Sequence, residues 1–260
     1  MSSYLRIPHH SPFRVGTWNI YGARRSPVGI TSITESARIA RAMNLDFLLL
    51  QEIEFEDDGL TLATESQELV DKLGFSHKSG LPLSPSQFSP TRKFGNAILS
   101  RYPLTSPRRF LVPNPSLFAT RGGRRLASHD KGFVCVDAYT PLGLVSVASI
   151  HLLPFHMFDV DPSKAPMIGM WTELAIGLEK ELLGRPFVVG GDFNTNDRSV
   201  FLSKFLEGRC PAAAGGAPTR PGKDRSFDDL VTWPGSYLAL GPVIPGFSDH
   251  HLVTASVWTR

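Results

Sequence analysis

Asp192 and Asn194 lie two positions apart, directly after the apolar segment 186–190. Side chains two residues apart in an extended chain project to the same face of a strand, so this carboxylate and this carboxamide should converge. Open α/β sheets bind ligands at the carboxyl ends of their strands. We therefore expect a ligand site where this segment ends.

Three other strand-like segments also end in a polar side chain, at Asn19, Glu52 and His151. Glu52 closes a segment with four consecutive apolar residues. An unpaired carboxylate is costly to bury there, so Glu52 needs a cation, either an arginine or a metal ion. Taken alone, Asn19 is more often a turn cap, and His151 more often a histidine bonded to backbone. The recurrence of the pattern is what makes all three candidates for a site.

A fifth candidate is the Asp249–His250 pair near the end of the chain. Adjacent residues of an extended segment point to opposite sides, so these two side chains cannot pair with each other. The imidazole of His250 therefore needs another carboxylate, and we expect Asp228 to supply it. His251 should face away from the site and is interpreted as structural.

Apolar runs that alternate with helical patterns supply these strand ends. Strands are expected at 13–20, 46–51, 95–100, 133–139, 144–151, 186–191, 228–233 and 252–258. Helices are expected at 32–43, 64–73, 166–183 and 198–207, with a capping box at Ser32 and a C-terminal cap at Gly74. Loops are expected at 80–93, 105–131, 154–165 and 211–226. This mixture suggests one α/β domain with two packed sheets and helices outside them.

The composition of the 260 residues is that of an ordinary globular protein, with 42% hydrophobic and 20% charged residues. The net charge of +3 permits a polyanionic partner without requiring one. Two cysteines in unlike contexts give neither a disulfide framework nor a zinc spacing. Because no apolar run approaches membrane-spanning length and the N-terminus lacks a signal-peptide pattern, we expect an intracellular, cytoplasmic protein without a membrane span.

Seven short motifs occur in order along the chain: TWN, LLQE, GNAILSRYPL, SIHL, GGDFN, FDDLV and SDHHLV. They resemble the motifs of the endonuclease/exonuclease/phosphatase superfamily, the deoxyribonuclease-I-like phosphodiesterases, over residues 13–257. Each motif is weak alone, whereas seven in order are highly specific. The resemblance implies a four-layer α/β sandwich, in which two packed mixed β-sheets are flanked by helices. We expect one such domain over 13–260, after an N-terminal tail at 1–12.

The resemblance also implies hydrolysis of a phosphate ester by water with Mg²⁺ or Mn²⁺ as the cofactor. Glu52 resembles the principal metal ligand of the family, and Asn19 and Asp249 resemble the residues that help to place the ion. The residues themselves agree with this. Two carboxylates and an amide oxygen, with no cysteine, favour Mg²⁺ or Mn²⁺ over zinc.

The remaining strand-end residues resemble the catalytic groups of the family. Asp192 resembles the residue that orients and deprotonates the attacking water, and Asn194 would hold a phosphate oxygen or that water. His250, held by Asp228, resembles the imidazole that faces the phosphate and stabilises its growing charge. His151 resembles a second imidazole near the leaving-group oxygen. How the two histidines share the role of general acid stays open.

The branch of the superfamily is narrowed by His151, because the AP-endonuclease branch carries tyrosine at this strand end. Deoxyribonuclease-I-type nucleases, deadenylases, sphingomyelinases and tyrosyl-DNA phosphodiesterases carry histidine there and remain open. The tyrosyl-DNA group usually lacks the phenylalanine of GDFN, and the chain shows no clear lipid-docking insertion. We therefore expect a nuclease that acts on DNA or RNA.

Basic and amide side chains around two of the expected loops are candidates for contacts with substrate phosphate: Arg92, Asn96, Arg121, Arg124 and Arg125. Such a loop could track a phosphate backbone, or it could be a solvated loop whose charges bind nothing specific. The alternatives to a nuclease are a phosphoesterase on small-molecule, inositol or lipid phosphates, a tyrosyl-DNA-phosphodiesterase-like repair enzyme, and a non-catalytic phosphate-binding member. We expect a monomer, and the sequence indicates no particular protein partner.

Overall fold

The structure is a computed structural model, which describes residues 12–23, 33–182, 184–198 and 217–259. Ser32, the predicted N-cap, lies outside these ranges, as does nearly all of the helix predicted at 198–207. Within them, no helix is long and apolar enough to cross a membrane.

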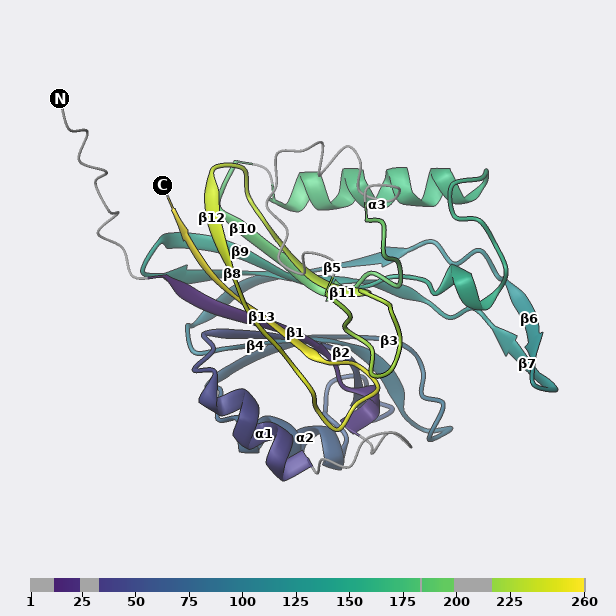
Figure 1. Ribbon diagram of the computed structural model, residues 1–260, viewed down its shortest axis with the longest axis horizontal. Helices are drawn as coiled ribbons and strands as arrows, with labels where there is room; N and C mark the ends of the chain where they lie inside the picture. The colour runs from purple at the N-terminus through teal and green to yellow at the C-terminus, as the bar shows by residue number, and fades with distance from the viewer. Residues whose placement is uncertain (1–11, 24–32, 183, 199–216, 260) are drawn as a thin grey trace.

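Two large mixed β-sheets pack against each other in the described part of the chain (Figure 1). The first has the order β12-β13-β1-β2-β4-β3, formed by β12 (Ser236–Ile244), β13 (Leu252–Thr259), β1 (Phe13–Asn19), β2 (Phe47–Phe55), β4 (Lys93–Ser100) and β3 (His77–Pro85). The second has the order β11-β10-β9-β8-β5, formed by β11 (Asp228–Thr232), β10 (Phe187–Asp192), β9 (Gly143–His151), β8 (Lys131–Thr140) and β5 (Leu104–Val112). Each sheet contains one parallel pair, β1 with β2 and β9 with β10.

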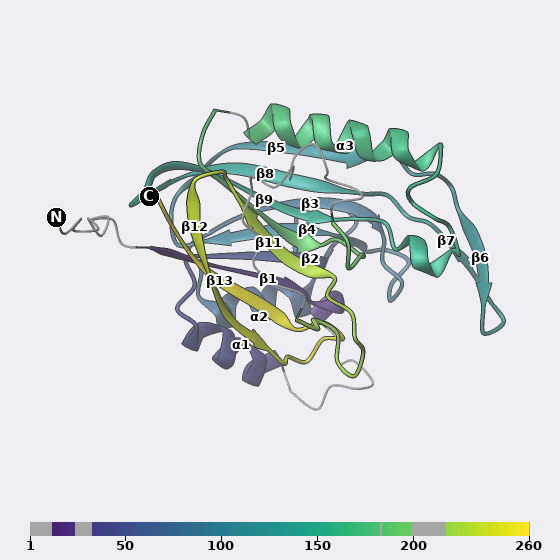
Figure 2. The same cartoon turned by 45° about the horizontal axis from the view of Figure 1, so that its top comes forward.

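Helices cover the outer faces of the two sheets. α1 (Ile33–Ala42) and α2 (Thr64–Leu73) lie on the first sheet, and α3 (Met167–Leu182) lies on the second (Figure 2). A two-stranded ribbon, β6 (Phe118–Arg121) with β7 (Arg124–Ala127), extends beyond one end of the sandwich. Two short 3₁₀ turns, η1 (Tyr21–Ala23) and η2 (Phe155–Met157), lie near the same end. This is the predicted four-layer arrangement.

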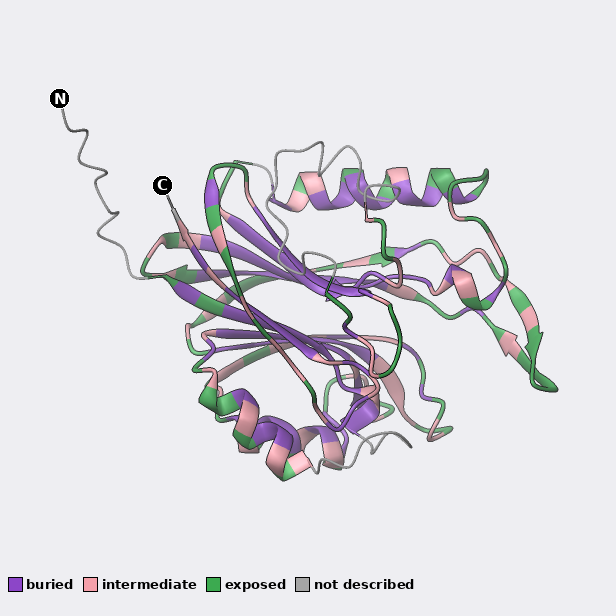
Figure 3. Ribbon diagram, viewed as in Figure 1, coloured by how far each residue is buried: buried purple, intermediate pink, exposed green. Residues whose placement is uncertain are grey.

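Alternation along the strands builds three apolar layers. In β1, Phe13 and Val15 pack between the sheets, whereas Trp18 packs under the helices of the first sheet. The layer between the sheets is rich in valine, and that under α3 includes Trp171 and Leu174. The central strands are therefore buried along most of their length, as Figure 3 shows by colour, because their alternate residues belong to different apolar layers. This double burial explains why these strands have nearly continuous apolar sequences.

Turn residues set the ends of several elements. Gly74 ends α2 in the left-handed conformation (φ 73°) and donates its N–H to the carbonyl of Val70. Gly143 (φ 88°) follows the two-residue turn between β8 and β9. The cap predicted at Gly74 is confirmed, and the strands predicted at 133–139 and 144–151 pair as a hairpin.

The predictions of a loop over 80–93 and over 105–131 are wrong in large part. The first range contains the second half of β3, and the second contains most of β5 and all of β6 and β7. β12 was not predicted at all. β3, β5 and β12 are edge strands, and β5 and β12 have many exposed residues. Edge strands need no continuous apolar run and tolerate proline, as β3 does at Pro82, so the pattern that identifies central strands misses them.

Candidate active site

The polar strand ends of both sheets meet at one end of the sandwich. In the second sheet, Asp192 lies opposite His151 of β9 and opposite Asp228 of β11. Asn19 ends β1 of the first sheet and reaches across to Asp192, with 3.1 Å between its Nδ2 and Oδ2 of the carboxylate. The meeting of the two sheets thus brings together residues that are up to 209 positions apart, from Asn19 to Asp228.

Glu52 is turned toward this place by a bulge in β2. The pairing of β2 with β4 shifts between Gln51 and Ile53, and Glu52 itself adopts φ 53°. A bulge redirects one side chain and ends regular pairing locally, and bulges are common beside active sites. Asn19 Nδ2 also donates to Oε1 of Glu52, at 3.2 Å. One amide therefore connects a carboxylate of each sheet.

The orientation of the Asn19 amide is fixed by its own neighbours. Its Oδ1 accepts a hydrogen bond from the backbone N–H of Tyr21 at 3.1 Å, which leaves Nδ2 to face Glu52 and Asp192. In this structure Asn19 thus orients two carboxylates, and its oxygen points to backbone. Asn19 was predicted to help to place a metal ion. Here it contacts Glu52 through its amide nitrogen.

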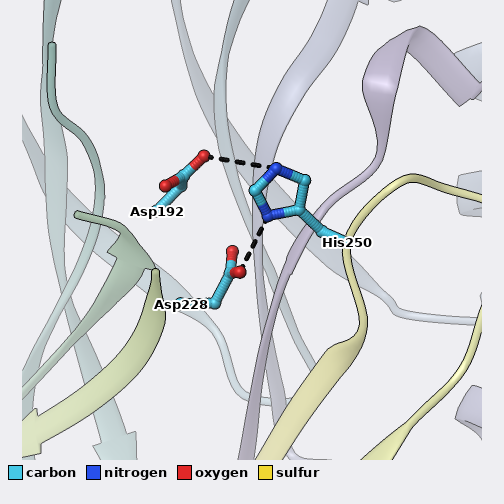
Figure 4. Close-up of side chains that lie close together, drawn as sticks. All are labelled: Asp192, Asp228 and His250. Carbon is cyan, nitrogen blue, oxygen red and sulfur yellow. Dashed lines mark hydrogen bonds and ion pairs between the residues drawn. The ribbon is translucent and has the colours of Figure 1, made fainter. Parts of the chain in front are cut away.

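His250 lies between two buried carboxylates, as Figure 4 shows. Nδ1 is 2.8 Å from Oδ2 of Asp228, the partner that the sequence predicts, and Nε2 is 3.6 Å from Oδ2 of Asp192. Burial alone would lower the pKa of His250, but Asp228 and Asp192 outweigh it and raise this pKa to about 9. His250 is therefore an imidazolium at neutral pH, with a negative charge on either side.

His151 has the opposite environment. Nζ of Lys131 lies 3.2 Å from Nδ1 and 3.1 Å from Nε2 of His151. Burial, Lys131 and His250 together hold the pKa of His151 well below its usual range. Nε2 of this neutral imidazole is 3.6 Å from Oδ2 of Asp192 and 3.9 Å from Oε1 of Glu52. The two histidines of the site thus differ in charge.

Lys131 is the site residue that the sequence reasoning missed, because it falls at the end of the loop expected at 105–131. Burial lowers the pKa of its amine, whereas the charges of Glu52 and Asp192 raise it. A usable signal was present in the hairpin register. Thr140 pairs with Gly143, and extending that pairing brings Gly132 opposite His151, with Lys131 next to it. The predicted strand began at 133, two residues too late to show this.

Two asparagines fix the orientation of the Asp192 carboxylate. Oδ1 accepts the backbone N–H of Asn194 at 2.9 Å, and Oδ2 accepts Nδ2 of Asn19. Burial and the charge of Asp228 raise the pKa of Asp192, and they outweigh His250 and these hydrogen bonds, which lower it. Asn194 has φ 53° and donates its side-chain nitrogen to the carbonyl of Leu152 at 2.8 Å. The carboxylate is thus fixed in orientation and its proton affinity is increased, as a general base requires.

Asp249 lies on the exposed side of the site and forms an ion pair with Arg220. Its charge raises the pKa of Glu52 and of Tyr21, so these three side chains share one electrostatic environment. Neither Tyr21 nor Arg220 was predicted. Tyr21 follows the Asn19 strand end by two residues, whereas Arg220 belongs to a loop whose sequence has no motif.

Two groups of ligand atoms are candidates for a metal ion. Asp192, Asp228 and His250 each offer an atom within 4.8 Å of the others. However, both nitrogens of His250 face carboxylates and its imidazole is charged, and a protonated histidine cannot ligate a metal. Glu52 and Asp249 offer two carboxylates of the kind that a hard divalent cation binds, and burial raises the pKa of Glu52, which a cation would reverse. Asp249 is paired with Arg220 in this structure, so an ion bound there would compete with that guanidinium.

Three of the five predicted phosphate contacts are used within the fold. Arg92 lies among three glutamates, the nearest being Glu65 at 2.8 Å. The side chain of Asn96 is fully buried and donates to the carbonyls of Gly132 and Ser149.

Arg121 forms an ion pair with Asp159 at 2.5 Å and donates to two η2 carbonyls. Arg124 is exposed on the ribbon, and Arg125 lies over the ring of Phe118, 4.8 Å from its centroid. Of the five, Arg125 alone lines the cavity that adjoins Glu52 and Lys131. The structure thus does not bring the predicted basic set together.

The comparisons with known proteins agree on the fold. A model of the Endonuclease/Exonuclease/phosphatase family matches residues 16–260. An endonuclease/exonuclease/phosphatase from Beutenbergia cavernae is 22% identical, with a TM-score of 0.70 over 95% of this chain and 72% of that one. A Bacteroides thetaiotaomicron mannosyl-6-phosphatase (11% identity, TM-score 0.60, covering 95% and 99%) and a truncated TDP2 from Caenorhabditis elegans (18%, 0.58, 95% and 98%) are also similar. The comparison with curated protein sequences gives no match.

These structural likenesses are below 25% identity and show the fold, whereas the family match spans nearly the whole chain. The match includes every strand end that contributes to the site, from Asn19 to His250. The chain therefore belongs to the Endonuclease/Exonuclease/phosphatase family, whose members are hydrolytic phosphoesterases that generally depend on a divalent metal.

Proposed function

We propose that the chain is a divalent-metal-dependent phosphodiesterase that hydrolyses a phosphate ester by attack of water. The observation that carries this is the placement of Asp192 between the charged His250 and the neutral His151, with Glu52 beside it. A general base, a cationic group and a carboxylate ligand lie within reach of one bound phosphate. DNA or RNA is the first substrate class to be tested.

Glu52 and Asp249 would hold Mg²⁺ or Mn²⁺, with Asn19 keeping the carboxylate of Glu52 in place. When bound, this ion would neutralise phosphate charge and polarise the phosphorus–oxygen bonds. Asp192 would take the proton of the attacking water, because its two oxygens are fixed by Asn19 and Asn194 and its burial favours the protonated product.

His250 and Lys131 would stabilise the negative charge that grows on the phosphate. Asp228 maintains His250 as an imidazolium, which can donate a hydrogen bond to a phosphate oxygen. On the other side, the ammonium of Lys131 contacts His151 and can donate to the substrate with its remaining hydrogens. His250 is therefore the histidine that carries a proton to donate, and His151 is the one that orients Lys131.

A small phosphate ester is the second candidate substrate, because of what surrounds the site. Arg92, Asn96 and Arg121 are engaged with other parts of the fold, so the basic track expected for a nucleic-acid backbone is largely missing among the described residues. Activity on a polymer would then depend on Arg124, Arg125 and residues outside the described ranges.

The test is hydrolysis of single-stranded DNA, duplex DNA, RNA and bis(p-nitrophenyl) phosphate, each with Mg²⁺, with Mn²⁺ and with chelator. We expect turnover on at least one substrate that chelator abolishes. Glu52→Ala should remove this turnover, whereas Glu68→Ala, an exposed glutamate of α2, should not. No metal-dependent turnover on any of the four, from protein with an intact circular dichroism spectrum, would refute the proposal.

A further inference from the structure

A cavity of about 310 Å³ opens directly beside the candidate active site. Glu52 and Lys131 line it on the side of the site. Its walls come from the β3–β4 connection, from β7 and from the η2 segment. The reaction centre and the cavity are therefore continuous, and a group attached to a phosphate at Glu52 could extend into it.

Apolar side chains make up much of the cavity wall. Phe94, Leu126 and Met157 line it from three different segments, and Pro154 and Phe158 complete the side formed by the η2 segment. Met157 is the last residue of the 3₁₀ turn η2 and keeps 39% of its surface exposed. An exposed apolar wall next to a charged reaction centre is typical of a ligand site.

The charged residues of the wall are mostly engaged elsewhere. The guanidinium of Arg125 lies over the ring of Phe118, which is outside the cavity. Burial and the charge of Lys131 lower the pKa of His129, so its imidazole is neutral at neutral pH. Beyond the Glu52–Lys131 side, the cavity thus offers little to a chain of further phosphates.

The walls are held in place by specific contacts. Arg121 ties the β6–β7 ribbon to the η2 segment through Asp159 and the carbonyls of His156 and Met157. On the other side, Phe94 packs edge-to-face on Phe88, with 5.6 Å between ring centroids. Both walls of the cavity are therefore braced before any ligand binds, which limits the entropy lost on binding.

The ring of Phe88 also connects this wall of the cavity to Tyr21, near the proposed metal ligands Glu52 and Asp249. Phe88 packs on Tyr21 with 5.0 Å between ring centroids, and Gly22 (φ 67°) lies against this row. A Cβ at Gly22 would come within 3.1 Å of Phe88 and 3.2 Å of Phe94. The row of rings thus requires glycine at this position both for its conformation and for space.

We propose that this cavity binds one aromatic, ring-sized group that is attached to the scissile phosphate. The volume is at the lower limit of small-molecule sites, so it accommodates one ring and excludes a second strand of nucleic acid. Flat faces of Phe94 and Pro154 and the thioether of Met157 are favourable partners for a ring. The proposal rests on the phosphodiesterase function and names its substrate class: an ester whose phosphate carries a nucleoside or a phenol.

Binding of phosphonates tests the cavity without requiring turnover, because their carbon–phosphorus bond is not hydrolysed. Titration calorimetry with Mg²⁺ present compares methylphosphonate, phenylphosphonate, hexylphosphonate and the 5′-phosphonate of thymidine. We expect phenylphosphonate to bind on the order of tenfold more tightly than methylphosphonate, which corresponds to about 1.4 kcal/mol. Hexylphosphonate, with six carbons in a flexible chain, should bind more weakly than phenylphosphonate because the chain must be ordered.

The 5′-phosphonate of thymidine distinguishes a nucleoside from a phenol as the source of the ring. If the nucleoside phosphonate binds more tightly than phenylphosphonate, the group is a nucleoside, and if it binds less tightly, the group is a phenol. Equal affinities for methylphosphonate and phenylphosphonate, or no binding of either, would overturn the proposal. Hexylphosphonate binding as tightly as phenylphosphonate would do so as well, because the cavity would then accept an alkyl chain.

Substitutions in the cavity wall test whether the tighter binding of phenylphosphonate arises at this cavity. Leu126→Asp and Met157→Asp should each reduce the ratio of phenylphosphonate to methylphosphonate affinity toward one. Leu60→Asp, an exposed leucine that lines a different cavity, is the matched control and should keep the ratio. A ratio that survives both wall substitutions refutes the location. Loss of turnover in the assays above with the ratio intact would instead refute the proposed function alone.

Discussion

Replacement of Lys131 by methionine removes one charge from the site and keeps the length of the side chain. Nζ of Lys131 lies 3.1 Å from Nε2 of His151, and burial lowers the pKa of this amine. Removal of one preorganised donor from a developing oxyanion costs about 10²–10³ in kcat, or about 2.7–4 kcal/mol. We expect Lys131→Met to lose on the order of a hundredfold in kcat with a smaller change in KM, because the lost contact strengthens in the transition state.

The same variant has a second readout that does not depend on catalysis. A unit charge 3.1 Å from His151 would repel an imidazolium by about 5 kcal/mol at an effective dielectric constant of about 20, which is an upper limit. The pKa of His151, followed by its NMR ring-proton shifts, should therefore rise in Lys131→Met, because one of the causes that lower it is removed.

Lys131→Arg, which keeps the charge, is the control and should leave the pKa of His151 low. An unchanged pKa in Lys131→Met would show that burial alone lowers it and that the contact in the structure is not maintained in solution. Full kcat in Lys131→Met would remove Lys131 from the mechanism, whatever the pKa of His151.

Three further predictions concern other buried groups. Asp228→Asn should lower the pKa of His250 from about 9, by NMR titration, and reduce kcat by at least about 10²-fold, since the 2.8 Å ion pair is lost; an unchanged kcat would exclude His250 as the required cation. Burial would raise the pKa of Asp137, but two arginines and Ser146 outweigh it and lower this pKa. The ionised Asp137 stabilises the fold above the carboxyl pKa of the unfolded chain, and this stabilisation is lost as pH falls through the folded pKa. Asp137→Asn should therefore lower the midpoint of urea unfolding at pH 7 and lower it less at pH 3. Equal decreases of the midpoint at the two pH values would contradict the ion pair. Burial raises the pKa of the Cys135 thiol to about 11, so in a Cys210→Ser background iodoacetamide at pH 8 should label the protein only after unfolding; rapid labelling of the folded protein would show that Cys135 is accessible.

The central strands and the residues at their ends were accessible from the sequence, because burial on both faces leaves a clear pattern. In β2 the four residues from Phe47 to Leu50 are apolar and fully buried, and the polar residues that follow them mark where the site begins. Asn19, Glu52, His151 and Asp192 all satisfy this rule. β5 and β12, at the sheet edges, do not, since much of their surface is exposed.

Charged residues outside the strand ends were not assignable in this way, because the sequence does not show their partners. Arg92 was expected at substrate phosphate, but three glutamates surround it. Lys131 was expected at the end of the loop at 105–131, but it begins β8 and lies within 3.2 Å of His151. Both differences arise from pairing across elements: the β8–β9 register places Lys131, and ion pairs with Glu65 of α2 and Glu54 of β2 hold Arg92. A composition argument cannot distinguish such cases.

Three residues at the site have a left-handed backbone conformation. Tyr21, Glu52 and Asn194 all have φ near 50° although none is glycine, and each adjoins a strand end that contributes to the site. Such a conformation costs of order 1 kcal/mol or more and persists only where the surroundings fix it. At Glu52 the bulge and the Asn19 amide fix it, and at Asn194 the hydrogen bonds to Asp192 and Leu152 do. In a regular strand at 51–53 the side chain of Glu52 would point in another direction. The strained conformation of Glu52 therefore keeps this proposed metal ligand directed into the site.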